Sequence, residues 1–294
     1  MSLPVVEQRP VSGFAIVGFA YVIAILVGST VLKVLSGVQP VFALAAADAA
    51  ATVTVFVFSR TFDNTSVYDP YWSVAPPVIA LWLVLVPGGG LLEARQVLVL
   101  ALTFAYGARL TFNWARGWAG LKHEDWRYAD FRQKTGKAYW LVSFWALHFF
   151  PTVMVFLGML PLIYGVTTPG FGWLDGGAAL VTAAAIVIEA VADEQLRGFR
   201  RAQKEPGAIC DVGLWAWSRH PNYFGELLFW VGLFLFGLAG GAPVWTGVGV
   251  VAMVALFLGA SIPLAEKRSL ARRPHYAEHQ KRVSMLLPLP PKKA

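Results

Sequence analysis

Four charged residues recur at helical spacing near the end of a long apolar stretch. They are Glu189, Asp193, Arg197 and Arg200. In a continuous α-helix these side chains fall within an arc of about 80° and so share one face. Because an ionisable side chain is costly to bury in an apolar segment, this face indicates a functional site, with arginines suited to phosphate groups. A purely structural alternative is a chain of ion pairs that joins neighbouring helices.

A second polar group lies in Leu214–Glu226, where a loop leads into the next apolar stretch. Pro221 favours an extended conformation for the residue before it and begins a helix after it. The free amide groups at that helix start suit an anion, and Asn222 and Glu226, one turn apart, suit the edge of a polar ring. Anchoring at a membrane interface would explain the aromatic residues here, but not the run Arg219–Asn222 together with Glu226 one turn into the span. Six residues are candidates for cofactor contacts: Trp215, Arg219, His220, Asn222, Tyr223 and Glu226.

Further candidates lie earlier in the chain. Tyr106, Arg109 and Asn113 are spaced so that they line one stripe of a helix over residues 96–114. The following loop contains Glu124–Tyr128, whose charged side chains are expected either to cover a cofactor or to lock neighbouring arginines, unless they are simply solvated. The most isolated acid, Asp48, can pair with a tyrosine or mark a proton or substrate path.

The composition indicates what kind of fold must position these residues. Of the 294 residues, 57% are hydrophobic and 14% are charged, and the mean hydropathy is +0.58. A soluble domain carries about 25% charged residues, so a soluble enzyme is excluded. The abundance of Trp and Phe excludes a disordered or collagen-like chain. The single cysteine, Cys210, excludes a disulfide framework and a multi-thiolate metal cluster.

The apolar runs predict an all-α, polytopic integral membrane helix bundle. A span needs about 20 apolar residues. Eight stretches qualify, or seven if a short one is re-entrant: residues 14–35, 40–59, 74–92, 96–114, 141–164, 174–196, 223–240 and 243–264.

The distribution of basic residues predicts the orientation of the bundle. Lys and Arg concentrate in residues 109–137, 197–219 and 267–293, and basic loops stay on the cytoplasmic side. With eight spans, both termini are cytoplasmic, and of the 24 basic residues only Lys33 and Arg95 lie on the opposite side of the membrane. We expect a bacterial cytoplasmic (inner) membrane protein whose cofactor site faces the cytoplasm.

Three motifs carry a resemblance to a known family. Ser218–Glu226 resembles the C-terminal signature of the steroid 5-alpha-reductase superfamily, and more closely its bacterial branch of membrane proteins of unknown function. Glu124–Tyr128 resembles a second signature of that branch, and Glu266–Tyr276 fits the usual C-terminal end. The resemblance covers about residues 60–287.

The resemblance implies where each molecule would bind. In that superfamily a nicotinamide cofactor lies within the C-terminal helices and a lipid enters from the N-terminal ones. A single membrane domain, 1–294, would then have its substrate side in residues 1–116 and its cofactor side in residues 117–294. Glu189 stands where relatives have an amide. The implied NADPH contacts are Glu189, Asp193, Arg197, Arg200, Trp215, Arg219, His220, Asn222, Tyr223, Glu226, Arg109, Asn113, Arg127, Tyr128 and Glu266.

The implied reaction is reduction of a carbon–carbon double bond conjugated to a carbonyl. It needs an aligned hydride donor and a group that neutralises the enolate oxygen, such as a tyrosine paired with a carboxylic acid. Tyr106, within a Tyr-x-x-Arg pattern like that of the superfamily, and Asp69, nearest in position to its glutamate, are the expected catalytic residues. Each residue has a structural alternative: Tyr106 as a tyrosine at the membrane interface, and Asp69 as a helix cap or part of a loop turn. The expected contacts with a steroid-like or other lipid substrate are Asp48, Tyr68 and Trp72.

Two other functions stay open. Isoprenylcysteine and phospholipid methyltransferases share a similar Arg-His-Pro-x-Tyr pattern and a following Glu that bind S-adenosylmethionine, but that cofactor has no phosphates to meet the arginines. A non-enzymatic lipid carrier would be favoured by internal repeats, which we do not find. We expect no metal site, no nucleic-acid partner and no obligate protein partner besides membrane lipids. The sequence does not decide whether the cofactor is NADPH or NADH, although the surplus arginines favour the extra phosphate of NADPH.

Overall fold

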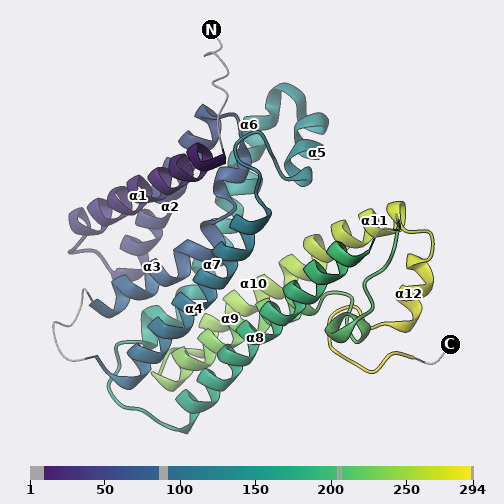
Figure 1. The fold of residues 1–294 in the computed structure, drawn as a ribbon. Helices are drawn as coiled ribbons and strands as arrows, with labels where there is room; N and C mark the ends of the chain where they lie inside the picture. The colour runs from purple at the N-terminus through teal and green to yellow at the C-terminus, as the bar shows by residue number, and fades with distance from the viewer. Residues whose placement is uncertain (1–9, 86–91, 204, 206, 293–294) are drawn as a thin grey trace. The chain divides into compact units, whose positions relative to one another are not determined.

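The computed structural model describes residues 10–85, 92–203, 205 and 207–292. Within these ranges the chain forms helices and no strand, which confirms the all-α class (Figure 1). The helices are α1 (Pro10–Val34), α2 (Pro40–Thr61), α3 (Tyr71–Leu85), α4 (Ala94–Gly117), α5 (Trp126–Thr135), α6 (Tyr139–Val142), α7 (Phe150–Gly165), α8 (Trp173–Ala202), α9 (Pro221–Ala239), α10 (Val248–Leu256), α11 (Ile262–Arg272) and α12 (Tyr276–Arg282).

Seven helical stretches among the described residues are long and apolar enough to cross a membrane. They correspond to seven of the eight expected spans. The remaining one, residues 74–92, is described as α3 only as far as Leu85, and residues 86–91 lie outside the described ranges. Two of the seven contain a π-helical segment, Ser143–Phe149 before α7 and Phe257–Ser261 between α10 and α11. The side of the membrane on which each terminus lies stays a prediction.

Many large apolar side chains point outward from these helices. Leu180 on α8 is 74% exposed and Val251 on α10 is 67% exposed. In water such exposure would be costly, whereas lipid tails solvate these side chains well. The exposed apolar surface therefore agrees with an integral membrane protein.

The chain divides into two compact units. Unit 1 comprises residues 1–82 and 110–156, and unit 2 comprises residues 83–109 and 157–294. The chain passes from one unit to the other within α3, within α4 and within α7. The expected substrate side, 1–116, and cofactor side, 117–294, are defined by the molecules that would bind there and not by contacts within the chain. Both therefore stay predictions.

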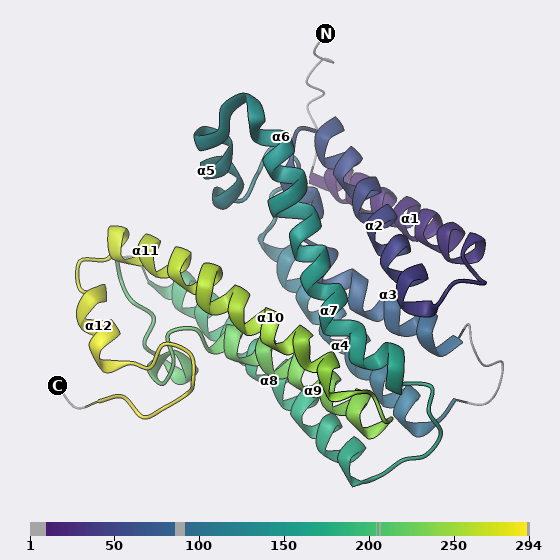
Figure 2. The same ribbon diagram turned by 180° about the vertical axis from the view of Figure 1, so that it is seen from behind.

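In unit 2, α8 and α9 pack closely along their length, and both views show them side by side (Figures 1 and 2). Small residues permit this approach. A Cβ atom on Gly225 would lie 2.5 Å from Cγ of Glu189, and one on Gly232 would lie 2.1 Å from Oγ1 of Thr182. The backbone of α9 therefore lies directly against side chains of α8, which brings Glu189 next to the start of α9.

Candidate active site

The centre of the candidate site is a buried tyrosine–glutamate pair in unit 2. The Tyr106 hydroxyl on α4 donates to Oε1 of Glu226 on α9 at 2.7 Å. Nε1 of Trp230, one turn further along α9, donates to the same oxygen at 2.9 Å. The Tyr106 ring stacks on Phe229 with centroids 3.7 Å apart. Both partners of the pair are buried, so this carboxyl group meets the tyrosine away from bulk solvent.

One turn after Tyr106, the guanidinium of Arg109 binds two acids of α8, Glu189 and Asp193. Its Nη1 donates to Oδ2 of Asp193 at 3.0 Å, and its Nη2 donates to Oε2 of Glu189. These contacts confirm that the two acids share a face, as the helical spacing predicts. Nε of Arg109 and Oε1 of Glu189 are buried and have no hydrogen-bond partner among the described residues.

The carboxyl groups of this cluster outnumber its cations. Glu189 and Glu226 lie close enough for their charges to interact, and Arg109 provides the positive charge beside them. Two adjacent buried carboxylates repel one another, and sharing one proton relieves that repulsion. The pair is therefore suited to hold a proton within reach of the Tyr106 hydroxyl.

A positively charged cluster lies beyond these acids in unit 2. Arg200 is close enough to Arg197 and Arg273 for their charges to interact, and it also interacts with Asp193. Burial lowers the pKa of His279, and the neighbouring positive charges of arginines, Arg273 among them, lower it further. Gathered cations of this kind attract anions such as phosphate groups.

The loop before α9 is fastened to the C-terminal segment. Nε of Arg219 binds Oε1 of Glu266 at 2.6 Å, and its Nη1 donates to the backbone oxygens of Gln280 and Val283 at 2.9 and 2.7 Å. His220 Nε2 lies 3.3 Å from the same oxygen of Glu266. Burial lowers the pKa of this imidazole, and Glu266 opposes the shift. In this structure Arg219 and Glu266, both expected to contact the cofactor, join the loop before α9 to the C-terminal segment.

The remaining residues of this segment differ in what they contact. Trp215 Nε1 donates to the backbone oxygen of Ala192 at 2.8 Å, which attaches the loop to α8. The Tyr223 ring lies parallel to that of His220, with centroids 5.3 Å apart. Asn222 is partly exposed, and no hydrogen bond of its side chain occurs within the described ranges. Its amide is therefore available to a ligand.

In unit 1, Asp69 pairs with another tyrosine. The Tyr128 hydroxyl donates to Oδ1 of Asp69 at 2.6 Å, and Nε of Arg127 binds Oδ1 of Asp125 at 2.8 Å. Burial raises the pKa of Asp69 to about 7, although the hydrogen bond from Tyr128 opposes the shift. The folded chain therefore favours the acid form of Asp69 up to about pH 7. A catalytic role for Asp69 together with Tyr106, and cofactor contacts by Arg127 and Tyr128, stay predictions.

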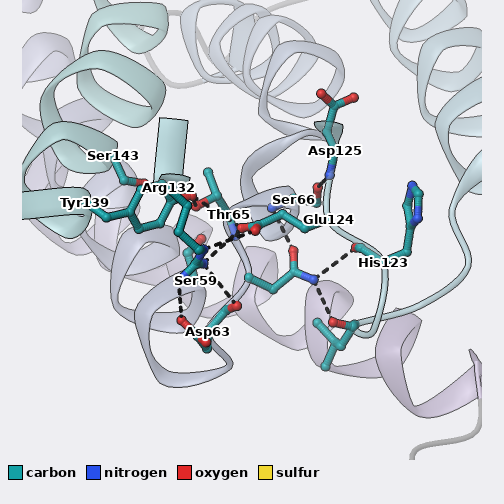
Figure 3. Close-up of polar contacts among 12 residues, drawn as sticks. Ser59, Asp63, Thr65, Ser66, His123, Glu124, Asp125, Arg132, Tyr139 and Ser143 are labelled. Carbon is teal, nitrogen blue, oxygen red and sulfur yellow. Dashed lines mark hydrogen bonds and ion pairs between the residues drawn. The ribbon is translucent and has the colours of Figure 1, made fainter. Parts of the chain in front are cut away.

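The loop signature Glu124–Tyr128 is anchored to the turn that follows α2 (Figure 3). Glu124 accepts a hydrogen bond from the backbone N–H of Thr65 at 2.9 Å and pairs with Arg132 at 3.1 Å. The backbone N–H of Asp125 donates to Oγ of Ser66 at 3.0 Å. Glu124 thus pairs with a neighbouring arginine, one of the roles expected for these acids, and the covering of a cofactor by this loop stays a prediction.

The expected substrate contacts lie in unit 1. Asp48 pairs with a tyrosine, as anticipated, and the partner is Tyr71. The buried Tyr68 hydroxyl lies 2.8 Å from Oγ1 of Thr152, and Trp72 is partly exposed. Asn113, on α4, accepts a hydrogen bond from Arg116 at 3.4 Å.

Sequence reasoning missed several residues that the structure uses. Trp230 lies one turn after Glu226, and that spacing could have identified it. Asn64 donates to the backbone oxygens of Leu121 and His123 at 2.7 and 3.0 Å, and its own Oδ1 caps the turn by accepting from the N–H of Ser66 at 2.8 Å. An Asn at such a turn start is a recognisable signal, whereas its bonds to a distant loop are not.

Comparison with known proteins places the chain in a family. Over 251 residues it is 28% identical to an uncharacterised protein of Schizosaccharomyces pombe, and the alignment covers 76% of this chain and 73% of the yeast protein. No solved structure matches the chain. Because that relative is fungal, the expected bacterial branch stays a prediction. Residues 55–283 match the family described as proteins of unknown function, DUF1295. The chain therefore belongs to the DUF1295 family, within the steroid 5-alpha-reductase-like superfamily.

Proposed function

We propose that this protein is a membrane-embedded, NADPH-dependent reductase of a carbon–carbon double bond conjugated to a carbonyl in a steroid-like or other lipid. The buried Tyr106–Glu226 pair beside Arg109 and its two acids is the observation that carries this proposal. A tyrosine that contacts a carboxyl group in an apolar setting is suited to donate to an oxygen on which negative charge develops.

The residues present in unit 2 fit a dinucleotide. The unpartnered Oε1 of Glu189 and the available amide of Asn222 would hold the nicotinamide carboxamide. The cluster of Arg197, Arg200 and Arg273 would hold the phosphates through charge-assisted hydrogen bonds. When bound, NADPH supplies the hydride.

The chain's own residues would then handle the proton. Glu226, with a proton shared from Glu189, donates to the Tyr106 oxygen and so turns the hydroxyl hydrogen toward the substrate carbonyl oxygen. As charge develops on that oxygen, Tyr106 stabilises it and passes on a proton, which Glu226 replaces. The reduced substrate thereby gains the hydride and one proton. Trp230, which donates to the same oxygen of Glu226, keeps the carboxyl group in place.

Cofactor binding is tested with purified protein in nanodiscs, titrated separately with NADPH, NADH and S-adenosylmethionine while heat unfolding is followed. We expect stabilisation by NADPH. Arg200→Ala and Asn222→Ala should each weaken NADPH binding about tenfold, which corresponds to about 1.4 kcal/mol. Arg201→Ala, an exposed arginine beside Arg200, is the matched control and should leave the affinity unchanged. Stabilisation by S-adenosylmethionine alone would support a methyltransferase and overturn the proposal.

The chemical step is tested by Tyr106→Phe. This variant keeps the ring that stacks on Phe229 and removes only the hydroxyl. It should bind NADPH with parental affinity and reduce an enone lipid about 100- to 1,000-fold more slowly, which is the usual cost of losing one donor to an oxyanion. Single-turnover oxidation of bound NADPH measures the rate. A parental rate in this variant would show that Tyr106 is not the donor.

A further inference from the structure

Unit 1 contains a cavity whose lining includes Asp48, one of the expected substrate contacts. It has a volume of about 90 Å³ and lies among α1, α2 and α3. A single water needs about 10–15 Å³ by this measure, so the cavity has room for several non-hydrogen atoms. Most of its wall is apolar, with Ala24, Leu32, Leu44, Val74 and Ile79 among the lining residues. The lining residues Ile25 and Ser29 are exposed, so the cavity opens at the surface of α1.

One carboxyl oxygen in this apolar wall has no partner. Asp48, on α2, is 7% exposed and lines the cavity. Its Oδ1 accepts a hydrogen bond from the Tyr71 hydroxyl, whereas its Oδ2 is buried and has no partner among the described residues. A buried polar atom without a hydrogen bond is costly, and a ligand that supplies one recovers that cost.

The surroundings of Asp48 limit what that ligand can be. Among the described residues, no Lys, Arg or His lines the cavity, so a carboxylate or phosphate head group would add a second uncompensated negative charge. The lining tyrosines already have partners: Tyr21 donates to the backbone oxygen of Tyr68 at 3.1 Å, and Tyr71 also accepts from Oγ1 of Thr52 at 3.0 Å. Among the buried side chains that line the described cavity, Asp48 is therefore the one with a polar atom, Oδ2, that lacks a partner.

We infer that this cavity binds a neutral lipid alcohol, with its hydroxyl on Oδ2 of Asp48 and its apolar tail leading out into the bilayer. A hydroxyl both donates and accepts, so it pairs with this oxygen whether Asp48 is ionised or protonated. An amine suits only the ionised form, and a ketone suits only the protonated form. The inference rests on residues of unit 1 and does not depend on the proposed reduction.

The test uses two photoreactive probes and the full-length protein in nanodiscs. One probe is hexadecanol with a diazirine near its hydroxyl end, and the other is the matched hexadecane diazirine without the hydroxyl. Labelled peptides are identified by mass spectrometry at increasing probe concentrations. In the wild-type protein, peptides of α1, α2 and α3 should be labelled by the alcohol at about tenfold lower concentration than by the alkane, as expected for one hydrogen bond to a buried oxygen.

Substitutions separate the hydroxyl contact from the fit of the tail. Asp48→Leu should abolish the preference for the alcohol, whereas Asp48→Asn, which can still donate and accept, should keep it within about threefold. Ala51→Phe, which places a ring in the cavity, should reduce labelling by both probes. Ser29→Ala, at the exposed edge, is the matched control and should keep the preference. Unchanged unfolding temperature and elution volume verify that each variant folds.

Several outcomes would overturn the inference. They are equal labelling of the wild-type protein by the two probes, labelling outside α1–α3, and an alcohol preference that survives in Asp48→Leu. Competition with unlabelled hexadecanol, hexadecylamine and palmitic acid identifies the head group, and stronger competition by the amine or the acid would contradict a neutral alcohol. Because the labelling needs no cofactor, its failure would not contradict the proposed reductase. Failure of the reductase tests would likewise not contradict the alcohol site.

Discussion

Replacing Arg109 with methionine gives the sharpest test of how the polar cluster in unit 2 is stabilised. The substitution keeps a long apolar side chain and removes the guanidinium that binds Glu189 and Asp193. Both acids then lose their hydrogen bonds to Arg109. Because all three side chains are largely buried, water cannot replace the lost contacts at low cost.

The magnitude follows from the burial of the three partners. The side chains of Arg109, Glu189 and Asp193 are 13%, 4% and 15% exposed. Removing one partner from a buried ion pair costs about 3–5 kcal/mol. Asp193 also interacts with Arg200, which still compensates its charge, so the lower end of that range applies. We therefore expect Arg109→Met to lower the free energy of unfolding by about 3 kcal/mol.

The measurement is unfolding by sodium dodecyl sulfate in mixed micelles, followed by tryptophan fluorescence. Arg109→Met combined with Glu189→Met removes both partners, and the double variant should recover about 2 kcal/mol relative to the sum of the single variants. Arg201→Met, an exposed arginine on α8, is the control and should change stability by less than about 0.5 kcal/mol. A loss below about 1 kcal/mol in Arg109→Met, with no coupling to Glu189, would refute the reasoning.

Two further predictions concern other parts of the fold. Because burial raises the pKa of Asp69 to about 7 from an ordinary 3.8, its contribution to stability should fall as pH rises from about 4 to 7, by at most about 4 kcal/mol. Asp69→Asn should remove that slope in unfolding titrations, and an unchanged slope would assign it elsewhere. Gly225→Ala places a Cβ 2.5 Å from Cγ of Glu189 and 3.0 Å from the oxygen of Ala185, so it should destabilise unit 2 by about 1–3 kcal/mol. Gly198→Ala, in open space on α8, should be neutral or stabilising, and equal effects of the two alanines would contradict the close packing of α8 and α9.

The helices could be predicted because bilayer thickness and helical periodicity act on local sequence. An apolar run of sufficient length has few alternatives in a membrane, and so seven spans agree with the structure. The same periodicity placed Glu189 and Asp193 on one face of α8, where both now bind Arg109. The π-helical segment Ser143–Phe149 has no comparable signal, since it depends on how neighbouring side chains pack rather than on a repeat.

Partners on different helices could not be predicted. Tyr106 and Glu226 are 120 positions apart, and nothing local to either indicates that α4 and α9 meet at that height. Asp48 was expected either to pair with a tyrosine or to mark a proton or substrate path, and the spacing could not select Tyr71 as its partner. Periodicity fixes which residues of one helix point the same way, whereas the neighbour and its rotation are set by packing over the whole bundle.

The segment Ser218–Glu226 joins two tasks that the sequence alone presents as one motif. Its first half is attached to the C-terminal segment, because the backbone N–H of Arg219 donates to the backbone oxygen of Ser284 at 2.8 Å and the Arg219 side chain binds Glu266. Its second half begins α9, where Gly225 allows contact with α8 and Glu226 meets Tyr106. Since helix geometry fixes the rise and rotation from Pro221 to Glu226, anchoring the start of α9 also sets the position of that carboxyl group. Arg219 therefore acts on the site by positioning it, and a contact with a phosphate is not needed to explain its place in the motif.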